Sequence, residues 1–193
     1  MLNKISKYVF ISFFIISIII PIFYIPIFSD IPVKKEKNFS SILKLDSNFA
    51  WPTPGYNYIT SPFGNRDAPN AYVSNDHAAI DIGAPENANI VSISDAVITF
   101  VGWNYAGGYS IRTDNGNIKV LFCHVSPNFI VHVGEHVKKG QIIGYVGPFN
   151  VYGISDNPYV DNNGNPTNGA TTGVHLHFSV RKDGELIDPM ELY

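Results

Sequence analysis

From residue 51 to its end, the chain consists of short runs of β-branched and aromatic residues separated by turn signals. The runs are ANIVSIS, AVITFVGW, YSIRT, IKVLFCHV, QIIGYVG and VHLHFSVR. Between them lie APEN, YAGG, DNGN, KKGQ and KDGE, in which Asn-Gly and Asp-Gly are the strongest hairpin signals. No window keeps a helical period of apolar residues. The sequence therefore predicts a mainly β domain over residues 51–193, an antiparallel β-sheet with very little helix.

The N-terminal part has a different composition. Residues 8–29 carry no charge over 22 residues, a length that can cross a hydrocarbon layer of about 30 Å. We interpret residues 1–29 as a membrane anchor. The alternative is a signal segment, although no small-residue cleavage site follows the apolar run. Residues 30–50 are polar and lysine-rich, which predicts a linker. Lysines lie on both sides of the apolar run, so the flanking charges do not fix its orientation in a membrane, which must be inferred from the function.

The charge of the predicted domain limits its partners. Residues 51–193 hold 13 acidic and 7 basic residues, a net charge of −6 with neutral histidines. An acidic domain without a basic stripe argues against nucleic acid as a partner. The single cysteine, Cys123, excludes an intramolecular disulfide and a cysteine-rich zinc site, and in the run VLFC it is typical of a buried apolar residue. No feature of the sequence indicates an oligomeric state.

Two histidines stand one residue apart in the run GVHLHF. A lone histidine in a strand is more often a core residue with one hydrogen bond than a ligand. His175 and His177, however, leave the same face of a strand about 6.8 Å apart. Burying two neighbouring imidazoles on one face is costly, and this favours a shared chemical role.

A second group of polar residues lies in NDHAAIDIGAP. In an extended strand His77 and Asp81 would be separated by roughly 13 Å, so they can share a metal only if the chain bends at Ala78 and Ala79. Taken alone, His77 could equally be a loop residue and Asp81 a turn or capping residue, with no metal between them. Together with the histidine pair and His124, they supply enough groups for three zinc ligands, a position open to water and acid–base partners.

Two other motifs overlap in the segment from His132 to Gly147. The first five residues, HVGEH, match the zinc motif H-x-x-E-H, which requires a helix, whereas Gly134 and the flanking valines favour a strand and a turn. The whole segment, HVGEHVKKGQIIGYVG, resembles the hairpin of barrel-sandwich hybrid folds. Carrier and phosphotransfer domains share that hairpin, so it does not choose a function.

The Asn- and Gly-rich segment 148–172 is unusually long for a loop, at 25 residues. It leads directly into the histidine pair, and we interpret it as a wall of a binding groove. The alternative is a tolerated surface insertion. Asp156, Asp161, Asn163 and Asn165 could bind calcium, but such turns are far more often simply solvated.

Taken together and in order, the motifs resemble a known family. The region from Ile59 to Pro189 is similar to the lysostaphin-type (LytM-like) zinc metalloendopeptidases that act on bacterial cell wall peptidoglycan. The matching stretches are ITSPFGNR, HAAID, AVITFVGW, LFCHVS, VHVGEHVKKGQIIGYVG, TTGVHLHFSVR and DGELIDP.

The resemblance implies a site with five residues. His77, Asp81 and His177 fall where the family has the ligands of its single zinc ion, and His124 and His175 fall where it has two catalytic histidines. The implied fold is an antiparallel sheet of the barrel-sandwich hybrid kind (a duplicated hybrid motif) with loops that form a groove over the metal. The implied activity is hydrolysis of peptide bonds in peptidoglycan stem peptides or cross-bridges.

We therefore expect a peptidoglycan endopeptidase anchored in a bacterial membrane with its domain on the extracytoplasmic side, or secreted if the N-terminal segment is cleaved. The alternative is a non-catalytic wall-binding or partner-activating module on the same scaffold. Four features depart from the family pattern: Ala79 replaces the usual glycine, Phe122 replaces a common tyrosine, Cys123 precedes His124, and the 148–172 loop is longer.

Overall fold

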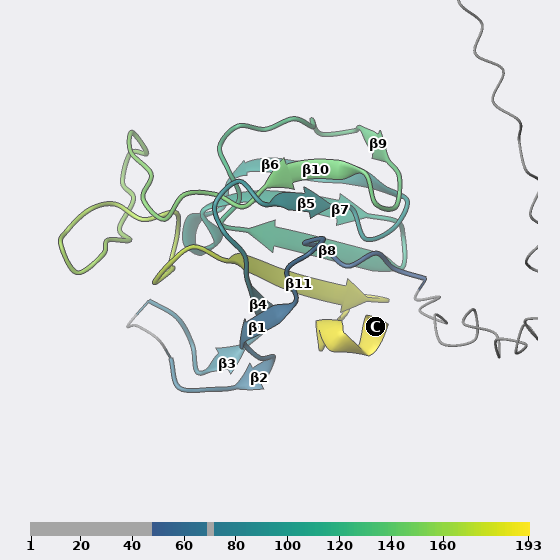
Figure 1. Cartoon of the computed structure of the whole chain (residues 1–193), viewed down its shortest axis with the longest axis horizontal. Helices are drawn as coiled ribbons and strands as arrows, with labels where there is room; N and C mark the ends of the chain where they lie inside the picture. The colour runs from purple at the N-terminus through teal and green to yellow at the C-terminus, as the bar shows by residue number, and fades with distance from the viewer. Residues whose placement is uncertain (1–47, 69–71) are drawn as a thin grey trace, which may run out of the picture. The chain divides into compact units, whose positions relative to one another are not determined.

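A computed structural model of the chain describes residues 48–68 and 72–193 (Figure 1). The predicted membrane anchor, residues 1–29, and most of the predicted linker lie outside these ranges. No helix within the described ranges is long and apolar enough to span a membrane. The elements are β1 (Tyr58–Ser61), β2 (Gly64–Asn65), β3 (Asp76–His77), β4 (Ile80–Gly83), β5 (Asn89–Val91), β6 (Ala96–Trp103), η2 (Tyr105–Gly107), β7 (Tyr109–Asp114), β8 (Ile118–Cys123), β9 (His136–Val137), β10 (Ile142–Tyr145), β11 (Leu176–Lys182), β12 (Glu185–Ile187) and η3 (Pro189–Leu192).

One antiparallel sheet of eight strands organises the domain. Its order is β1-β4-β11-β8-β7-β6-β9, and β12 pairs with the free part of β11. Two small antiparallel pairs, β5 with β10 and β2 with β3, stand beside it. The predicted mainly β, antiparallel fold with very little helix is confirmed for the described residues, whose only helices are the short 3-10 turns η2 and η3.

The two faces of this sheet have different roles because side chains alternate along each strand. The inward residues of β8 and β11 are almost fully buried: Ile118, Val120, Phe122, Leu176, Phe178 and Val180. The rings of Phe122 and Phe178 lie 5.7 Å apart and join the two strands through the core. The residues between them, which include His177, point to the opposite face, called the outer face below.

The small sheet of β5 and β10 closes the core from the other side. Ile90 and Ile143 are fully buried within it. A Cβ atom added to Gly144 would lie only 2.8 Å from Cδ1 of Ile111, so β10 packs closely against the inward face of β7. In Figure 1 β5 and β10 accordingly lie over β6 and β7.

The segment from His132 to Gly147 corrects one expectation. The structure does contain two strands joined by the Lys-Lys-Gly turn, but they do not pair with each other: β9 pairs with β6, and β10 pairs with β5. The turn is held instead by the bond from Gly140 N to Ser92 O. As expected, the H-x-x-E-H motif is not helical, because Gly134 has a φ of +89° and His136 begins β9.

The long loop, residues 148–172, folds back on itself and packs against η2. Isolated bridges join Asn150 to Thr167 and Val160 to Pro166. Its Asp161 carboxylate accepts hydrogen bonds from three asparagines of the loop. At its end, Ala170 N donates to Ala106 O at 2.8 Å. The end of the loop is therefore part of the packed domain.

Two glycine substitutions in the loop distinguish the energetic cost of backbone strain from the cost of disturbing close packing. Gly169 and Gly164 have nearly equal φ values, +80° and +81°, but a Cβ on Gly169 would lie 2.3 Å from Gly108 N, whereas a Cβ on Gly164 meets no atom within 4 Å. We expect Gly164→Ala to cost about 1–2 kcal/mol of unfolding free energy, from backbone strain. Gly169→Ala should cost about 1–3 kcal/mol more, because the loop must move away from η2.

Urea unfolding of the two variants measures this difference. Equal free energies of unfolding in the two variants would show that the loop does not depend on this close approach.

Candidate metal centre

The pairing of β4 with β11 places two of the predicted ligands beside each other. Asp81 and His177 are directly opposite in the antiparallel register. His77 ends β3, and the chain bends at Ala78 and Ala79 before β4 begins, which is the bend required for His77 and Asp81 to approach each other.

The three predicted ligands form a small triangle of potential donor atoms. His77 Nε2 lies 3.3 Å from both His177 Nδ1 and Asp81 Oδ1, and these last two atoms lie 3.0 Å apart. Two ligand atoms on a tetrahedral zinc, at bond lengths of about 2.0–2.1 Å, would lie roughly 3.3–3.4 Å apart. The triangle therefore fits one face of a tetrahedral metal centre.

Neighbouring groups orient two of the three candidate ligands, His77 and Asp81. The backbone carbonyl of Pro62 accepts a hydrogen bond from His77 Nδ1–H at 2.8 Å, which leaves the lone pair of Nε2 for a metal. Asp81 turns Oδ1 to the histidines, while its Oδ2 accepts a hydrogen bond from Arg66 Nη1 at 3.0 Å. The same nitrogen of Arg66 donates to the Ser61 hydroxyl. Arg66 thus fixes which carboxylate oxygen is free for a metal.

The electrostatics favour the protonation states that a metal requires. Burial opposes ionisation of Asp81, but the neighbouring side chains of His175, His177 and His77 outweigh it and hold the pKa of the carboxyl well below its usual range. Burial lowers the pKa of His177, although Asp81 partly opposes that shift. A carboxylate and two neutral imidazoles around a divalent ion would leave a net charge of +1.

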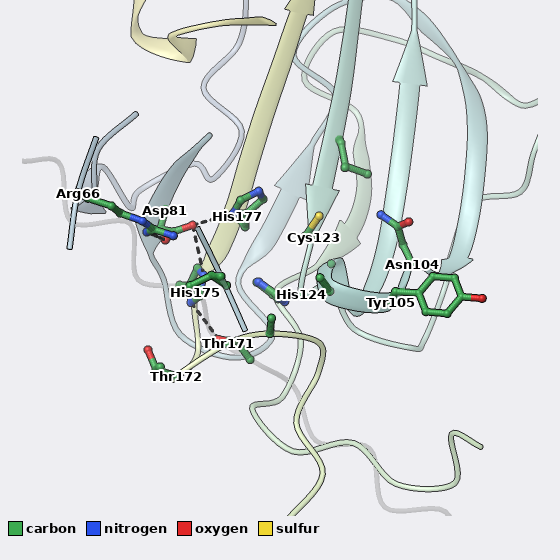
Figure 2. Close-up of a pocket in the computed structure, with 15 residues that line it drawn as sticks. Arg66, Asp81, Asn104, Tyr105, Cys123, His124, Thr171, Thr172, His175 and His177 are labelled. Atoms are coloured by element: carbon green, nitrogen blue, oxygen red, sulfur yellow. Dashed lines mark hydrogen bonds and ion pairs between the residues drawn. The ribbon is translucent and has the colours of Figure 1, made fainter. Parts of the chain in front are cut away.

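The two predicted catalytic histidines, His124 and His175, lie beside Asp81 and His177 (Figure 2). His175 Nε2 lies 3.4 Å from Asp81 Oδ1, and its Nδ1–H donates to Gly173 O at 3.1 Å. His124 follows β8, and its ring centroid is 4.9 Å from that of His175 and 5.9 Å from that of His177. Burial, and then the neighbouring His175 and His177, lower the pKa of His124, which keeps its ring neutral.

His124 is held in an unusual backbone conformation. Its φ of +59° is rare for a residue with a side chain and is typical of functional positions. Its Nδ1–H donates to Asn168 O at 2.6 Å, and its backbone N–H donates to Gly107 O at 2.9 Å. Asn168 is itself fixed, because Oδ1 accepts from Tyr109 N and Nδ2 donates to Val125 O. The long loop therefore sets the tautomer of His124 and leaves its Nε2 for chemistry.

The departures from the family pattern are accommodated locally. Ala79 is fully buried and is not among the residues with a positive φ, so this position does not require glycine. Phe122 points into the core, where a tyrosine hydroxyl would need a partner. Burial raises the pKa of the Cys123 thiol to about 12. Cys123 is therefore a neutral part of the floor of the site and not a nucleophile.

A hollow of about 400 Å³ connects these residues on the outer face. Residues 170–172 at the end of the long loop line one side of it, and η2 lines another. In Figure 2, Tyr105 lies across the hollow from Arg66 and Asp81. Its volume is within the range of roughly 300–1,000 Å³ typical of ligand sites.

The structure adds supporting residues to the five that the sequence predicted. They are Arg66, which holds Asp81; Asn168, which holds His124; and Thr171, whose hydroxyl lies 3.4 Å from His175 Nδ1. Arg66 belongs to the motif ITSPFGNR, which indicated the family but not this contact. Nothing in the sequence distinguishes Asn168 from the other asparagines of its loop.

Known proteins are similar to this chain over the same region. The model of Peptidase family M23 matches residues 75–189. A DD-carboxypeptidase/endopeptidase, Mpg, of Neisseria meningitidis is 30% identical over 139 residues, which are 71% of this chain and 27% of Mpg. The chain thus spans about a quarter of that relative's length.

Two solved structures are similar to the described domain. A zinc-containing peptidase from Vibrio cholerae superposes with a TM-score of 0.57 at 26% identity, over 72% of this chain and 38% of that one. The catalytic domain of lysostaphin from Staphylococcus simulans superposes with a TM-score of 0.50 at 26% identity. The match covers 70% of this chain and 89% of that domain's chain. The resemblance drawn from the motifs is confirmed, and the chain belongs to Peptidase family M23.

Proposed function

We propose that the chain is a zinc-dependent endopeptidase that hydrolyses peptide bonds in the stem peptides or cross-bridges of bacterial peptidoglycan. The observation that carries the proposal is the triangle of His77 Nε2, Asp81 Oδ1 and His177 Nδ1, whose sides of 3.0–3.3 Å suit a tetrahedral ion. Membership of a peptidase family, and the resemblance to lysostaphin-type enzymes of the cell wall, support the substrate class.

The proposed division of labour follows from the hydrogen bonds. When bound, zinc supplies Lewis acidity, which makes water more acidic and polarises a carbonyl. His175 and His124 both donate from Nδ1 to backbone carbonyls, so each keeps the Nε2 lone pair as a base. Neither is needed as a metal ligand, and both border the same hollow.

In the hydrolysis, one histidine accepts a proton from the attacking water as the new C–O bond forms at the peptide carbonyl. The C–N bond then breaks, and the amine nitrogen receives a proton from a histidinium. The second histidine donates a hydrogen bond to the carbonyl oxygen in its imidazolium form, from Nε2–H, while negative charge develops on that oxygen. The two imidazoles thus replace the glutamate of helical zinc peptidases.

The substrate also fixes the proposed location. Peptidoglycan lies outside the cytoplasmic membrane, so the apolar segment 8–29 would hold the domain on the extracytoplasmic side. Cleavage of that segment would release the domain.

The two histidines of the strand should differ in their effect on zinc. We expect His177→Ala to weaken zinc binding by more than about 100-fold, because it removes a ligand. His175→Ala should keep zinc but lose at least about 100-fold in activity, because it removes a proton-transfer group. His132→Ala is the control, since its side chain is exposed and pairs with Glu135 at 3.1 Å.

Zinc content, measured by mass spectrometry after dialysis of the purified full chain, tests this asymmetry. Equal loss of metal from the His177 and His175 variants would mean that both are ligands and that the proposed division is wrong.

Hydrolysis itself should depend on the metal. The full chain, purified in a mild detergent because of segment 8–29, should release soluble peptide fragments from cell wall preparations. Chelation should abolish the release, and added zinc should restore it. Mass spectrometry of the fragments identifies the bond that is cut. Bound zinc with no hydrolysis of any wall preparation would refute the enzyme and favour a wall-binding module on the same scaffold.

A further inference from the structure

The outer face of the sheet carries a second hollow next to the metal centre. Its volume is about 560 Å³, and it shares Leu121 with the hollow over the metal centre. Arg112 of β7, Lys119 of β8 and Arg181 of β11 line it. We refer to these three residues and the hollow they line as the basic hollow.

The strand register places the basic hollow further along the same face as the metal ligands. His177 pairs with Cys123, Ser179 with Leu121, and Arg181 with Lys119. Arg181 is four residues beyond His177, so their Cα atoms are separated by roughly 13 Å. An extended peptide rises about 3.3 Å per residue, so a peptide bound at the metal centre would reach the basic hollow within three to four residues.

The concentration of charge is unusual for this domain. Residues 51–193 have a net charge of −6, yet three of their seven basic residues line the basic hollow. One acidic residue, Asp114, lines it too, and it is paired with Lys119 at 3.2 Å. The hollow is therefore positively charged within an acidic domain.

The two arginines keep donors for a ligand. The guanidinium of Arg112 lies over the ring of Phe100, 5.6 Å from its centroid, which orients it without neutralising its charge. Arg181 donates from Nη1 to Gly184 O at 3.2 Å. Among residues 48–68 and 72–193, no carboxylate forms an ion pair with either arginine. A planar guanidinium with free N–H groups is suited to bind a carboxylate through two hydrogen bonds.

We propose that the basic hollow binds a free carboxylate of the peptide substrate, three to four residues from the bond that is cut. The occupant is an acidic peptide, which the domain prefers over the same peptide with its carboxylates amidated. The inference rests on the proposed endopeptidase function, because that function places a peptide on the outer face. Beyond that function, the inference specifies that the peptide substrate is acidic.

A pair of peptides and variants that each remove one positive charge test the proposal. The peptides have one wall-derived sequence, with carboxylates either free or amidated. Arg112→Gln and Arg181→Gln remove one charge each, and Lys182→Gln is the matched control, because Lys182 neighbours Arg181 but points to the other face of β11. Binding is measured on the zinc-loaded full chain in a His175→Ala background to prevent turnover, and kcat/KM is measured without that change.

Each arginine variant should raise the Kd for the acidic peptide about tenfold and lower kcat/KM by a similar factor. This is the effect expected from the loss of one charge-assisted hydrogen bond. Binding of the amidated peptide should change less than about twofold, and Lys182→Gln should leave both unchanged. Equal affinity of the unmodified domain for the two peptides, or equal weakening of both by the arginine variants, overturns the proposal.

Failure of the proposed function gives a different result. In that case, no variant and no unmodified chain hydrolyses either peptide, whatever the binding data. Arginine-dependent preference for the acidic peptide without hydrolysis would support the basic hollow and refute the endopeptidase.

Discussion

The buried carboxylate of Asp81 is the group on which the candidate metal centre depends. Its Oδ1 lies within 3.4 Å of nitrogens of His77, His175 and His177, and its Oδ2 accepts from Arg66. A buried charge without partners would be costly, and Asp81 is surrounded by His77, which is close in sequence, and by three side chains that are more distant in sequence. The antiparallel register of β4 with β11 brings Asp81 and His177 together, and the rest of the site is arranged around that pair.

The long loop completes the site by close backbone contact. Gly169 and Gly108 approach so closely that neither position has room for a side chain, and this brings the Asn168 carbonyl to His124 Nδ1. The end of the loop is therefore required for the orientation of a catalytic candidate, whereas its outer turn around Asp161 is satisfied by its own hydrogen bonds. A loop that looks like an insertion in the sequence is in part a structural support.

The two faces of the sheet have different roles, and this explains why core residues and site residues alternate along its strands. Inward residues such as Phe122 and Phe178 form the core, and outward residues include first the candidate metal ligands and then the residues of the basic hollow. The strand runs and turn signals were enough to predict the elements, because alternation and turn chemistry act over a few residues. Pairing of β9 with β6 was not predicted, because which strand becomes a neighbour depends on contacts distant in sequence.

By itself, the sequence determined the mainly β class, the five polar residues of the site and the resemblance to a peptidase family, because residue type and short spacing carry that information. Only the tertiary structure decided that His77 Nε2, Asp81 Oδ1 and His177 Nδ1 form one triangle, that Arg66 and Asn168 hold the site, and that three basic residues gather beside it. These contacts join residues up to 100 positions apart, and strand register fixes them through the packing of the whole domain.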